Sequence, residues 1–277
     1  MLAALVAWAW VRTQAIDVER LARRDPGRTA LMRQREREAV AKGKRYRESR
    51  AWVPYSRISA HLRRAVLIAE DDAFFSHDGL DWNEIRESAK HDLRTGRLAR
   101  GGSTITQQLA KNLWLGTSRT PMRKLEELIL AIRLERSLSK RRIFELYLNE
   151  IEWGDGIYGC EAAARRWFGT SAAALDARQS VRLAAVIINP RRYSPLEPPR
   201  RIERRVRLIA SRMRRRGELS EADWRAVLGM PAPADSSGAA DSAGAGPDSA
   251  GPPGTTAAPE NAAAPPPVEP APPDSVP

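Results

Sequence analysis

The chain of 277 residues contains a single cysteine, Cys160, and three histidines, His61, His77 and His91. One cysteine excludes an internal disulfide, and no group of histidines and cysteines has the spacing of zinc ligands. We therefore expect neither a disulfide-stapled domain nor a metal site built from protein side chains.

Apolar runs long enough to cross a membrane are also lacking. Residues 1–11 (MLAALVAWAWV) are uncharged and apolar, and Arg12 follows them at once. At about 1.5 Å of rise per residue, this run spans about half of a ~30 Å hydrocarbon core, and it has no basic n-region of a secretory signal. We expect it to be a truncated membrane anchor. The alternatives are a segment that lies in the membrane interface and an ordinary first helix that packs on a core.

Residues 231–277 lack lysine and arginine, and they hold 13 of the 20 prolines and six carboxylates. This composition cannot bury enough apolar surface to offset the entropy of ordering, which predicts a disordered Ala/Pro-rich acidic tail. Because the whole chain is +12, residues 1–230 carry a formal charge of +18. Such a body is attracted to nucleic acid, anionic lipid or a pyrophosphate-bearing substrate, and charge alone does not choose among them.

The periodicity of the remaining chain predicts a mainly α-helical fold, since strong period-2 strands are absent. Residues 12–51 form a charged helical connector in this interpretation, and residues 52–230 form the folded domain. Ser59 is a suitable N-cap for a helix that ends near Glu70. Further helices are predicted over residues 82–95 and after the capping residues Thr104, Thr120 and Ser139, and glycines interrupt the pattern between residues 154 and 159.

The segment at the end of the first core helix is rich in carboxylates and aromatic residues, and it contains a histidine. Glu70-Asp71-Asp72 stands at a helix C-terminus, where the helix dipole disfavours negative charge, and Phe74 and His77 follow. A carboxylate in a partly apolar niche has a raised pKa, which suits a general base for a sugar hydroxyl. A solvated helix end is the alternative interpretation.

A second segment, residues 101–112 (GGSTITQQLAKN), combines two glycines with a capped helix. Ser103, Thr104, Gln108 and Lys111 are predicted to share one helix face, where they could hold phosphate oxygens and sugar hydroxyls. A capped surface helix is the alternative. Glu127 shares a face with apolar residues and needs a partner, so it indicates either a functional carboxylate or a structural ion pair with Arg123 or Lys124.

Together these segments resemble the peptidoglycan glycosyltransferases of family 51, and among them the monofunctional type, the biosynthetic transglycosylases. The matching motifs follow the order and spacing of that family over residues 52–215. They are AEDDAFFSHDG (69–79), RGGSTITQQLAKNLWL (100–115), RKLEE (123–127), SLSKRRIFELYLNEIEWGDGIYG (137–159) and EAAARRWFG (161–169).

The resemblance implies a lysozyme-like two-lobed fold and an enzyme that polymerises lipid II into β-1,4-linked glycan strands. Undecaprenyl pyrophosphate is released with inversion at the sugar. Glu70 is implied as the catalytic base, and Glu127 as a second catalytic carboxylate that assists departure of the pyrophosphate or positions the acceptor. The implied substrate-binding residues are Asp71, Phe74, His77, Gly102, Ser103, Thr104, Gln107, Gln108, Lys111, Asn112, Arg123, Lys124 and Lys140.

The resemblance also implies a location at the bacterial inner membrane, with the catalytic domain on the periplasmic face. Lipid II, the nascent glycan strand and the membrane lipid surface are the expected partners, with cell-wall synthesis and division proteins as further candidates and no nucleic acid. No cofactor is expected, and stimulation by a divalent cation stays open. A lytic enzyme, a nucleic-acid-binding protein and an inactive membrane scaffold are the competing interpretations.

Overall fold

The computed structural model describes residues 2–80, 103–118 and 120–231, which belong to a unit spanning Met1–Pro233. Gly102, the helix predicted over residues 82–95 and the predicted tail beyond Pro231 lie outside the described residues. The predictions made for those segments therefore stay predictions.

The mainly α-helical prediction is confirmed. The described helices include the 3-10 turns η1 (Glu19–Ala22), η2 (Tyr55–Arg57) and η3 (Phe74–Ser76) and the π-helical turn η4 (Lys111–Leu115). The α-helices are α1 (Leu2–Gln14), α2 (Ala30–Ala41), α3 (Ala60–Glu70), α5 (Ile105–Ala110), α6 (Pro121–Ser137), α7 (Lys140–Glu150), α8 (Cys160–Phe168), α9 (Ala177–Val186), α10 (Arg200–Arg215) and α11 (Glu221–Leu228).

Side-chain caps start several of these helices where the sequence predicts them. Thr104, Thr120 and Ser139 each accept a hydrogen bond from a backbone N–H in the first turn of α5, α6 and α7. Ser59 occupies the predicted N-cap position of α3, but its hydroxyl donates to the carbonyl of Leu175 at 2.8 Å and caps nothing. The buried position of Ser59 offers this tertiary acceptor, which sequence periodicity does not reveal.

A small sheet interrupts the helices between α7 and α8. The strand order in this sheet is β1 (Ser49–Arg50), β3 (Ile157–Tyr158) and β2 (Glu152–Gly154). The central strand β3 pairs in parallel with β1 and in antiparallel orientation with β2. The sequence does not predict this sheet, because strands of two or three residues show no alternation. The Asp155-Gly156 turn, where Gly156 has φ +71°, is the local signal of the β2–β3 hairpin.

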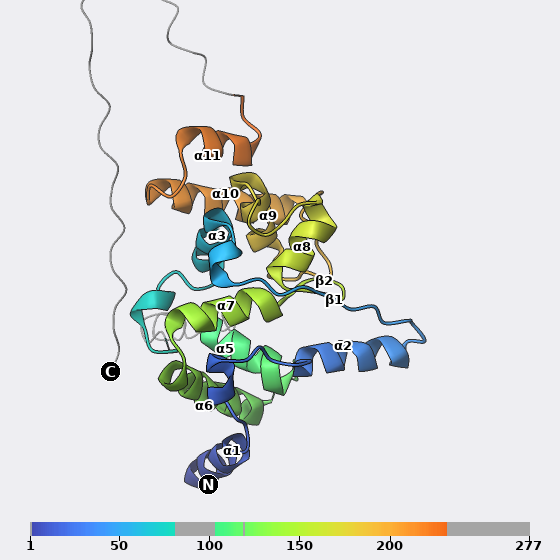
Figure 1. Cartoon of the computed structure of the whole chain (residues 1–277), viewed down its shortest axis with the longest axis vertical. Coiled ribbons are helices and arrows are strands. Elements are labelled where there is room, and N and C mark those ends of the chain that lie inside the picture. Colours follow the sequence, from blue (N-terminus) through green and yellow to red (C-terminus); the bar gives the residue numbers. More distant parts are fainter. Residues whose placement is uncertain (1, 81–102, 119, 232–277) are drawn as a thin grey trace, which may run out of the picture. The chain divides into compact units, whose positions relative to one another are not determined.

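The helices contact one another in two groups. The helices α3, α9, α10 and α11 pack together, while α5, α6, η4, α1 and α2 form the other group. Figure 1 shows α7 between these groups, and α7 packs mainly against α5. The end of α3 and the start of α5, which carry the predicted site, meet where these two groups of helices adjoin.

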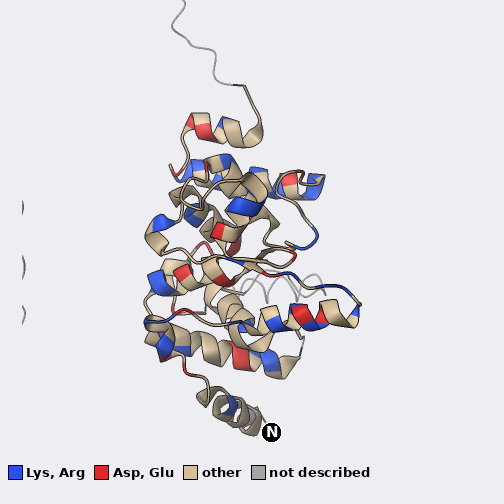
Figure 2. Ribbon diagram, turned by 45° about the vertical axis from the view of Figure 1, so that its right-hand side comes forward, with Lys and Arg blue, Asp and Glu red and all other residues tan. Residues whose placement is uncertain are grey.

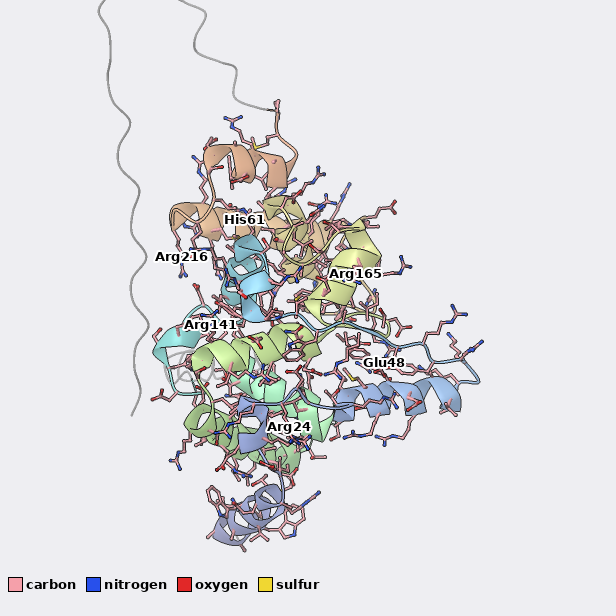
Figure 3. All side chains as sticks on the ribbon, viewed as in Figure 1. Arg24, Glu48, His61, Arg141, Arg165 and Arg216 are labelled. Atoms are coloured by element: carbon pink, nitrogen blue, oxygen red, sulfur yellow. The ribbon has the colours of Figure 1, made fainter. Side chains whose placement is uncertain are left out.

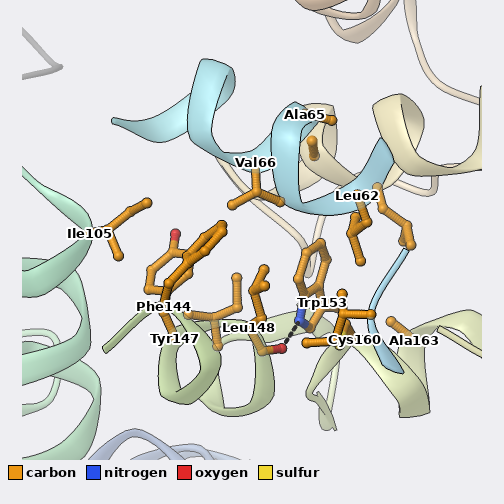
Figure 4. Close-up of a cluster of buried hydrophobic side chains, with 14 of the residues drawn as sticks. Leu62, Ala65, Val66, Ile105, Phe144, Tyr147, Leu148, Trp153, Cys160 and Ala163 are labelled. Atoms are coloured by element: carbon orange, nitrogen blue, oxygen red, sulfur yellow. Dashed lines mark hydrogen bonds between the residues drawn. The ribbon is translucent and has the colours of Figure 1, made fainter. Parts of the chain in front are cut away.

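The hydrophobic core joins α3 to α7 (Figure 4). Leu62 and Val66 of α3 recur at helical spacing and are fully buried, as are Phe144 and Leu148 of α7. Trp153 is also fully buried, and its indole N–H donates to the carbonyl of Leu148 at 3.3 Å. Burial of such side chains contributes about 1.5–3 kcal/mol each, so this layer fixes where α3 ends.

The N-terminal helix α1 packs on α6 through one narrow face. Ala9 is buried, and Arg133 of α6 donates to the carbonyls of Thr13 and Ile16 at the end of α1. Trp8 and Trp10, which flank Ala9 in the helix, are each nearly half exposed. Within the described part of the chain, none of the helices combines the length and the apolar character that a membrane crossing requires.

Gly156 tests the fit of the sheet. A Cβ at this position would lie 2.2 Å from the carbonyl oxygen of Arg47, whereas a Cβ at Gly169, with a similar φ of +66°, meets nothing within 4 Å. We expect Gly156→Ala to lower the free energy of unfolding by about 2–4 kcal/mol and Gly169→Ala by about 1 kcal/mol. Urea unfolding measures both, and equal losses would contradict the close packing of the hairpin turn.

Candidate active site

Glu70 is the last residue of α3, and two side chains from distant parts of the chain hold its carboxylate. Its Oε2 accepts a hydrogen bond from Nε2 of Gln108 in α5 at 3.1 Å. Its Oε1 accepts from Arg205 of α10 at 2.6 Å, and the same guanidinium donates to the carbonyl of Ala69 at 3.0 Å. The carboxylate of Glu70 is thus fixed from both of its oxygens.

Tyr147 determines which way the Gln108 amide faces. The Tyr147 hydroxyl is fully buried and donates to Oε1 of Gln108 at 3.2 Å. Because a carboxamide has one oxygen and one nitrogen, this hydrogen bond turns the nitrogen of Gln108 towards Glu70. Tyr147 is therefore a positioning residue for the Glu70 carboxylate.

Burial raises the pKa of Glu70 above the ordinary value of a glutamate. The positive charge of Arg205, the hydrogen bond from Gln108 and the charge of Lys111 lower the pKa, and they offset the burial only in part. Glu70 consequently accepts a proton more readily than an exposed carboxylate does, as the sequence predicts for a partly apolar niche.

Asp71 connects the end of α3 to the start of α5. Its Oδ2 accepts from the backbone N–H of Ile105, the first residue of α5, at 2.9 Å, and its Oδ1 lies 3.0 Å from Nε2 of His77. The N–H of Gly79 donates to Nδ1 of His77 at 3.2 Å, so a neutral His77 carries its proton on Nε2 and donates it to Asp71. Asp71 is buried, which makes these contacts decisive for the position of α5.

Thr104 and Gln107 are buried and hold the backbone of the His77–Gly79 segment. The Thr104 hydroxyl and the Gln107 amide donate to the carbonyl of Gly79 at 2.7 and 3.4 Å. Gly79 has φ +84°, and a Cβ there would lie 2.9 Å from Cγ of Glu135. These contacts are structural, and the predicted contacts of Thr104 and Gln107 with a substrate stay predictions.

Glu127 lies in α6 with 2% of its surface exposed, in agreement with its predicted place on an apolar face. Arg123 and Lys124, its predicted partners, both form ion pairs with it. Lys124 Nζ also donates to Oε1 of Gln107 at 2.8 Å and to Oγ of Ser103 at 3.1 Å. The ion pair that was the alternative interpretation of Glu127 is therefore present, and it extends into the 103–112 segment.

A continuous chain of hydrogen bonds joins the two predicted catalytic carboxylates. Gln108, which donates to Glu70, also donates to the carbonyl of Ser103 at 3.4 Å. The Ser103 hydroxyl accepts from Lys124, which pairs with Glu127. The fold thus brings Glu70, Gln108, Ser103, Lys124 and Glu127 into one polar network.

Lys111 stands beside this network at the wall of a cavity of about 230 Å³. Burial lowers the pKa of Lys111 below that of an ordinary lysine, while the negative charges of Glu127 and Glu70 raise it. Gln108, Asn112 and Tyr147 line the same cavity, whose other walls come from α2, β2 and residues 187–191. We call it the Lys111 cavity.

Phe74 and Lys140 form a separate cluster at the start of α7. Phe74 is fully buried against Phe144, and Nζ of Lys140 lies 4.4 Å from the centre of the Phe74 ring. Lys140 also pairs with Glu135 at 2.8 Å. Among the described residues, Lys140 therefore contacts Glu135 and not the Glu70–Glu127 network, and its predicted place beside a pyrophosphate stays a prediction.

Neither Arg205 nor Tyr147 is among the residues that the sequence predicts for the site. Arg205 is one of many arginines in α10, yet it stands at i+3 from Ile202 and i−4 from Ile209, both buried. This spacing marks Arg205 as the arginine beside the apolar face and could have identified it. Tyr147 stands at i+3 from Phe144 in α7, where helical spacing predicts burial but does not identify the partner of its hydroxyl.

The adjacent carboxylates Asp71 and Asp72 allow a matched test. Asp72 is half-exposed and pairs with Arg216, which Figure 3 shows at the end of α10. We expect Asp71→Ala to lower the free energy of unfolding by about 2–4 kcal/mol, because the buried donors of Ile105 and His77 lose their acceptor. Asp72→Ala should cost less than about 1 kcal/mol. Similar losses in urea unfolding would contradict the role of Asp71.

The known proteins that resemble this chain agree with one another in family and name. Residues 36–214 match the family described as Transglycosylase. Several relatives carry the name biosynthetic peptidoglycan transglycosylase. The one from Methylobacillus flagellatus is 54% identical over 163 residues, which cover 59% of this chain and 71% of the relative.

The relative from Aromatoleum aromaticum is 48% identical over 68% of this chain and 82% of its own length. The relative from Dechloromonas aromatica is 43% identical over 76% of this chain and 85% of its own length. The match to the family spans α3, α5, α6, α7 and α10, which carry the network around Glu70, and it agrees with the expected lysozyme-like fold. The chain therefore belongs to the transglycosylase family, together with these biosynthetic peptidoglycan transglycosylases.

Proposed function

We propose that the protein is a peptidoglycan glycosyltransferase that polymerises lipid II into β-1,4-linked glycan strands and releases undecaprenyl pyrophosphate. Membership of the transglycosylase family and the names of its relatives support the reaction class. The observation that carries the proposal is the polar network from Glu70 to Glu127. In it, Glu70, whose pKa is raised, is linked through Gln108 and Ser103 to the cation that pairs with Glu127, and Arg123 and Lys111 add two further cations to this region.

Glu70 is the base in this proposal. It takes the proton of the 4-hydroxyl of the acceptor sugar while that oxygen attacks C1 of the donor, the growing strand. The bond between C1 and the pyrophosphate oxygen breaks on the opposite face, so the α-linkage becomes a β-linkage. The raised pKa of Glu70 supports this role, because a base works best when its pKa approaches the working pH.

The leaving pyrophosphate needs positive charge near the breaking bond. Lys111, Arg123 and Lys124 supply it in this proposal, and Glu127 holds the last two cations in place. The reaction needs neither a nucleotide nor a covalent enzyme intermediate, and we expect no cofactor. Assays with and without EDTA decide whether a divalent cation stimulates the reaction.

We also propose that the protein works at the bacterial inner membrane with its catalytic unit on the periplasmic face. Trp8, Trp10 and Val11 of α1 are exposed, which suits contact with lipid, and both substrates carry polyprenyl chains. Cell-wall synthesis and division proteins are candidate partners at that surface. The net positive charge supports attraction to anionic lipid.

Glu70→Gln tests the proposed base. We expect the variant to keep its fold and to lose polymerisation of fluorescent lipid II in detergent by at least about a thousandfold, because the amide cannot accept the proton. Asp72→Asn, which changes the carboxylate two residues away in the same segment, is the control and should keep activity. Long glycan strands from the Glu70→Gln variant would remove Glu70 from this role.

Tyr147→Phe tests the positioning of Gln108. Without the Tyr147 hydroxyl, the Gln108 amide is free to rotate away from Glu70, and the pKa of Glu70 rises further. Activity requires deprotonated Glu70, so the acid limb of the pH–rate profile should move to higher pH by up to about one unit. Tyr158→Phe removes another buried tyrosine hydroxyl, which is bonded to Tyr46, and should leave the profile unchanged. An unshifted profile for Tyr147→Phe would contradict the positioning role.

A further inference from the structure

A second cavity, of about 210 Å³, lies where the connection after α2 meets the β2–β3 hairpin. Six cationic side chains and two carboxylates line it. The cations are Arg35, Lys42, Lys44, Arg45, Arg47 and Arg191, and the carboxylates are Glu38 and Asp155. We call it the basic cavity, and Figure 2 shows lysine and arginine along the connection after α2.

Both carboxylates of the basic cavity are already engaged. Glu38 accepts from Arg35 at 2.9 Å and from Arg191 at 3.2 Å, and Asp155 accepts from Arg191 at 2.9 Å. Within residues 2–80, 103–118 and 120–231, no ion pair involves Lys42, Lys44, Arg45 or Arg47, all of which are exposed. The lining therefore has an excess of four positive charges.

The backbone that carries these cations is fixed at several points. The N–H of Lys44 donates to the carbonyl of Ala39 at 2.9 Å, where α2 ends. The Tyr46 and Tyr158 hydroxyls are hydrogen-bonded at 3.1 Å, and the N–H of Ser49 donates to the carbonyl of Gly156 at 2.8 Å. A tethered backbone holds the charges near one another in spite of their mutual repulsion, as a binding site for an anion requires.

The basic cavity adjoins the Lys111 cavity. Arg35 and Arg191 line both, and Gln108, Lys111 and Tyr147 of the proposed active site also line the Lys111 cavity. A substrate that extends from Lys111 past Arg35 therefore reaches the basic cavity. Arg123 and Lys124 of α6, which the proposed function assigns to the pyrophosphate, line neither cavity, so the cations of the basic cavity are not needed for that role.

We propose that the basic cavity binds the carboxylates of the stem peptide carried by the glycan strand, an inference that rests on the proposed function. The sugars of the glycan strand are uncharged, whereas each stem peptide ends in a free carboxylate and carries other carboxylates along its length. Exposed cations around a concave surface attract such a peptide and orient it. Binding there selects substrates with an acidic stem and helps to hold the strand beside Lys111 and Glu70.

The test uses the variant Lys44→Gln/Arg45→Gln, which removes two cations of the lining and keeps the backbone contact of Lys44. The control is Arg200→Gln/Arg201→Gln, which removes two exposed cations from the first turn of α10. Polymerisation is measured against the concentration of two forms of lipid II, one with free stem carboxylates and one with the carboxylates converted to amides. A fluorescent disaccharide-pentapeptide without lipid gives a binding measurement that needs no turnover.

For lipid II with free carboxylates, we expect the KM of the Lys44→Gln/Arg45→Gln variant to be roughly fivefold higher than that of the unmodified protein, with little change in kcat. The difference in KM should shrink as the salt concentration rises from about 50 to about 300 mM. The amidated lipid II should be used equally by the variant, the control and the unmodified protein. The labelled disaccharide-pentapeptide should bind the variant correspondingly more weakly. An equal effect on both forms of lipid II, or no effect on either, overturns the proposal.

Two further outcomes are separable. If the unmodified protein polymerises neither form of lipid II, the proposed function has failed. Binding of the disaccharide-pentapeptide then decides alone whether the basic cavity binds stem carboxylates. Weaker binding by the variant supports this proposal, and equal binding overturns it. If the variant loses binding to vesicles of anionic phospholipid but treats both forms of lipid II as the unmodified protein does, the cavity contacts a membrane and the proposal is wrong.

Discussion

The buried carboxylate of Asp71 sets the geometry on which the rest of the site depends. It accepts the first backbone N–H of α5 and the proton of His77, so the end of one helix and the start of another cannot move independently. Glu70 precedes Asp71 in α3, and Gln108 follows Ile105 by one helical turn in α5. The pairing of Glu70 with Gln108 is therefore a consequence of the Asp71 contact, and Tyr147 and Arg205 complete it from α7 and α10.

The site balances burial against positive charge. Burial raises the pKa of Glu70 and lowers that of Lys111, and both changes favour the uncharged form of the group. Arg205 and Gln108 limit the first change, while Glu127 and Glu70 limit the second. Partners from other elements therefore support the charged form of each group. The balance depends on residues from α3, α5, α6 and α10, so it exists only in the folded chain.

Local signals predict the helices and several of their ends, because a cap needs only neighbours in the sequence. Thr104, Thr120 and Ser139 illustrate this, while Ser59 shows the limit, since its hydroxyl bonds to a segment more than a hundred residues away. The sheet lacks a periodic signal because its strands are too short. The pairing of Glu127 with Arg123 and Lys124 follows from helical spacing, whereas the link from Lys124 to Ser103 requires α5 and α6 to pack.

By itself the sequence determined the mainly α-helical fold, the residues able to act as base and as cations, and the family to which they point. These depend on side-chain chemistry and on spacing within single helices, which are local properties. Only the tertiary structure decided that Arg205 and Tyr147 hold the Glu70 network, that Lys140 pairs with Glu135, and that a basic cavity adjoins the Lys111 cavity. Contacts between segments far apart in the chain arise from the packing of whole elements, and no local pattern encodes their partners.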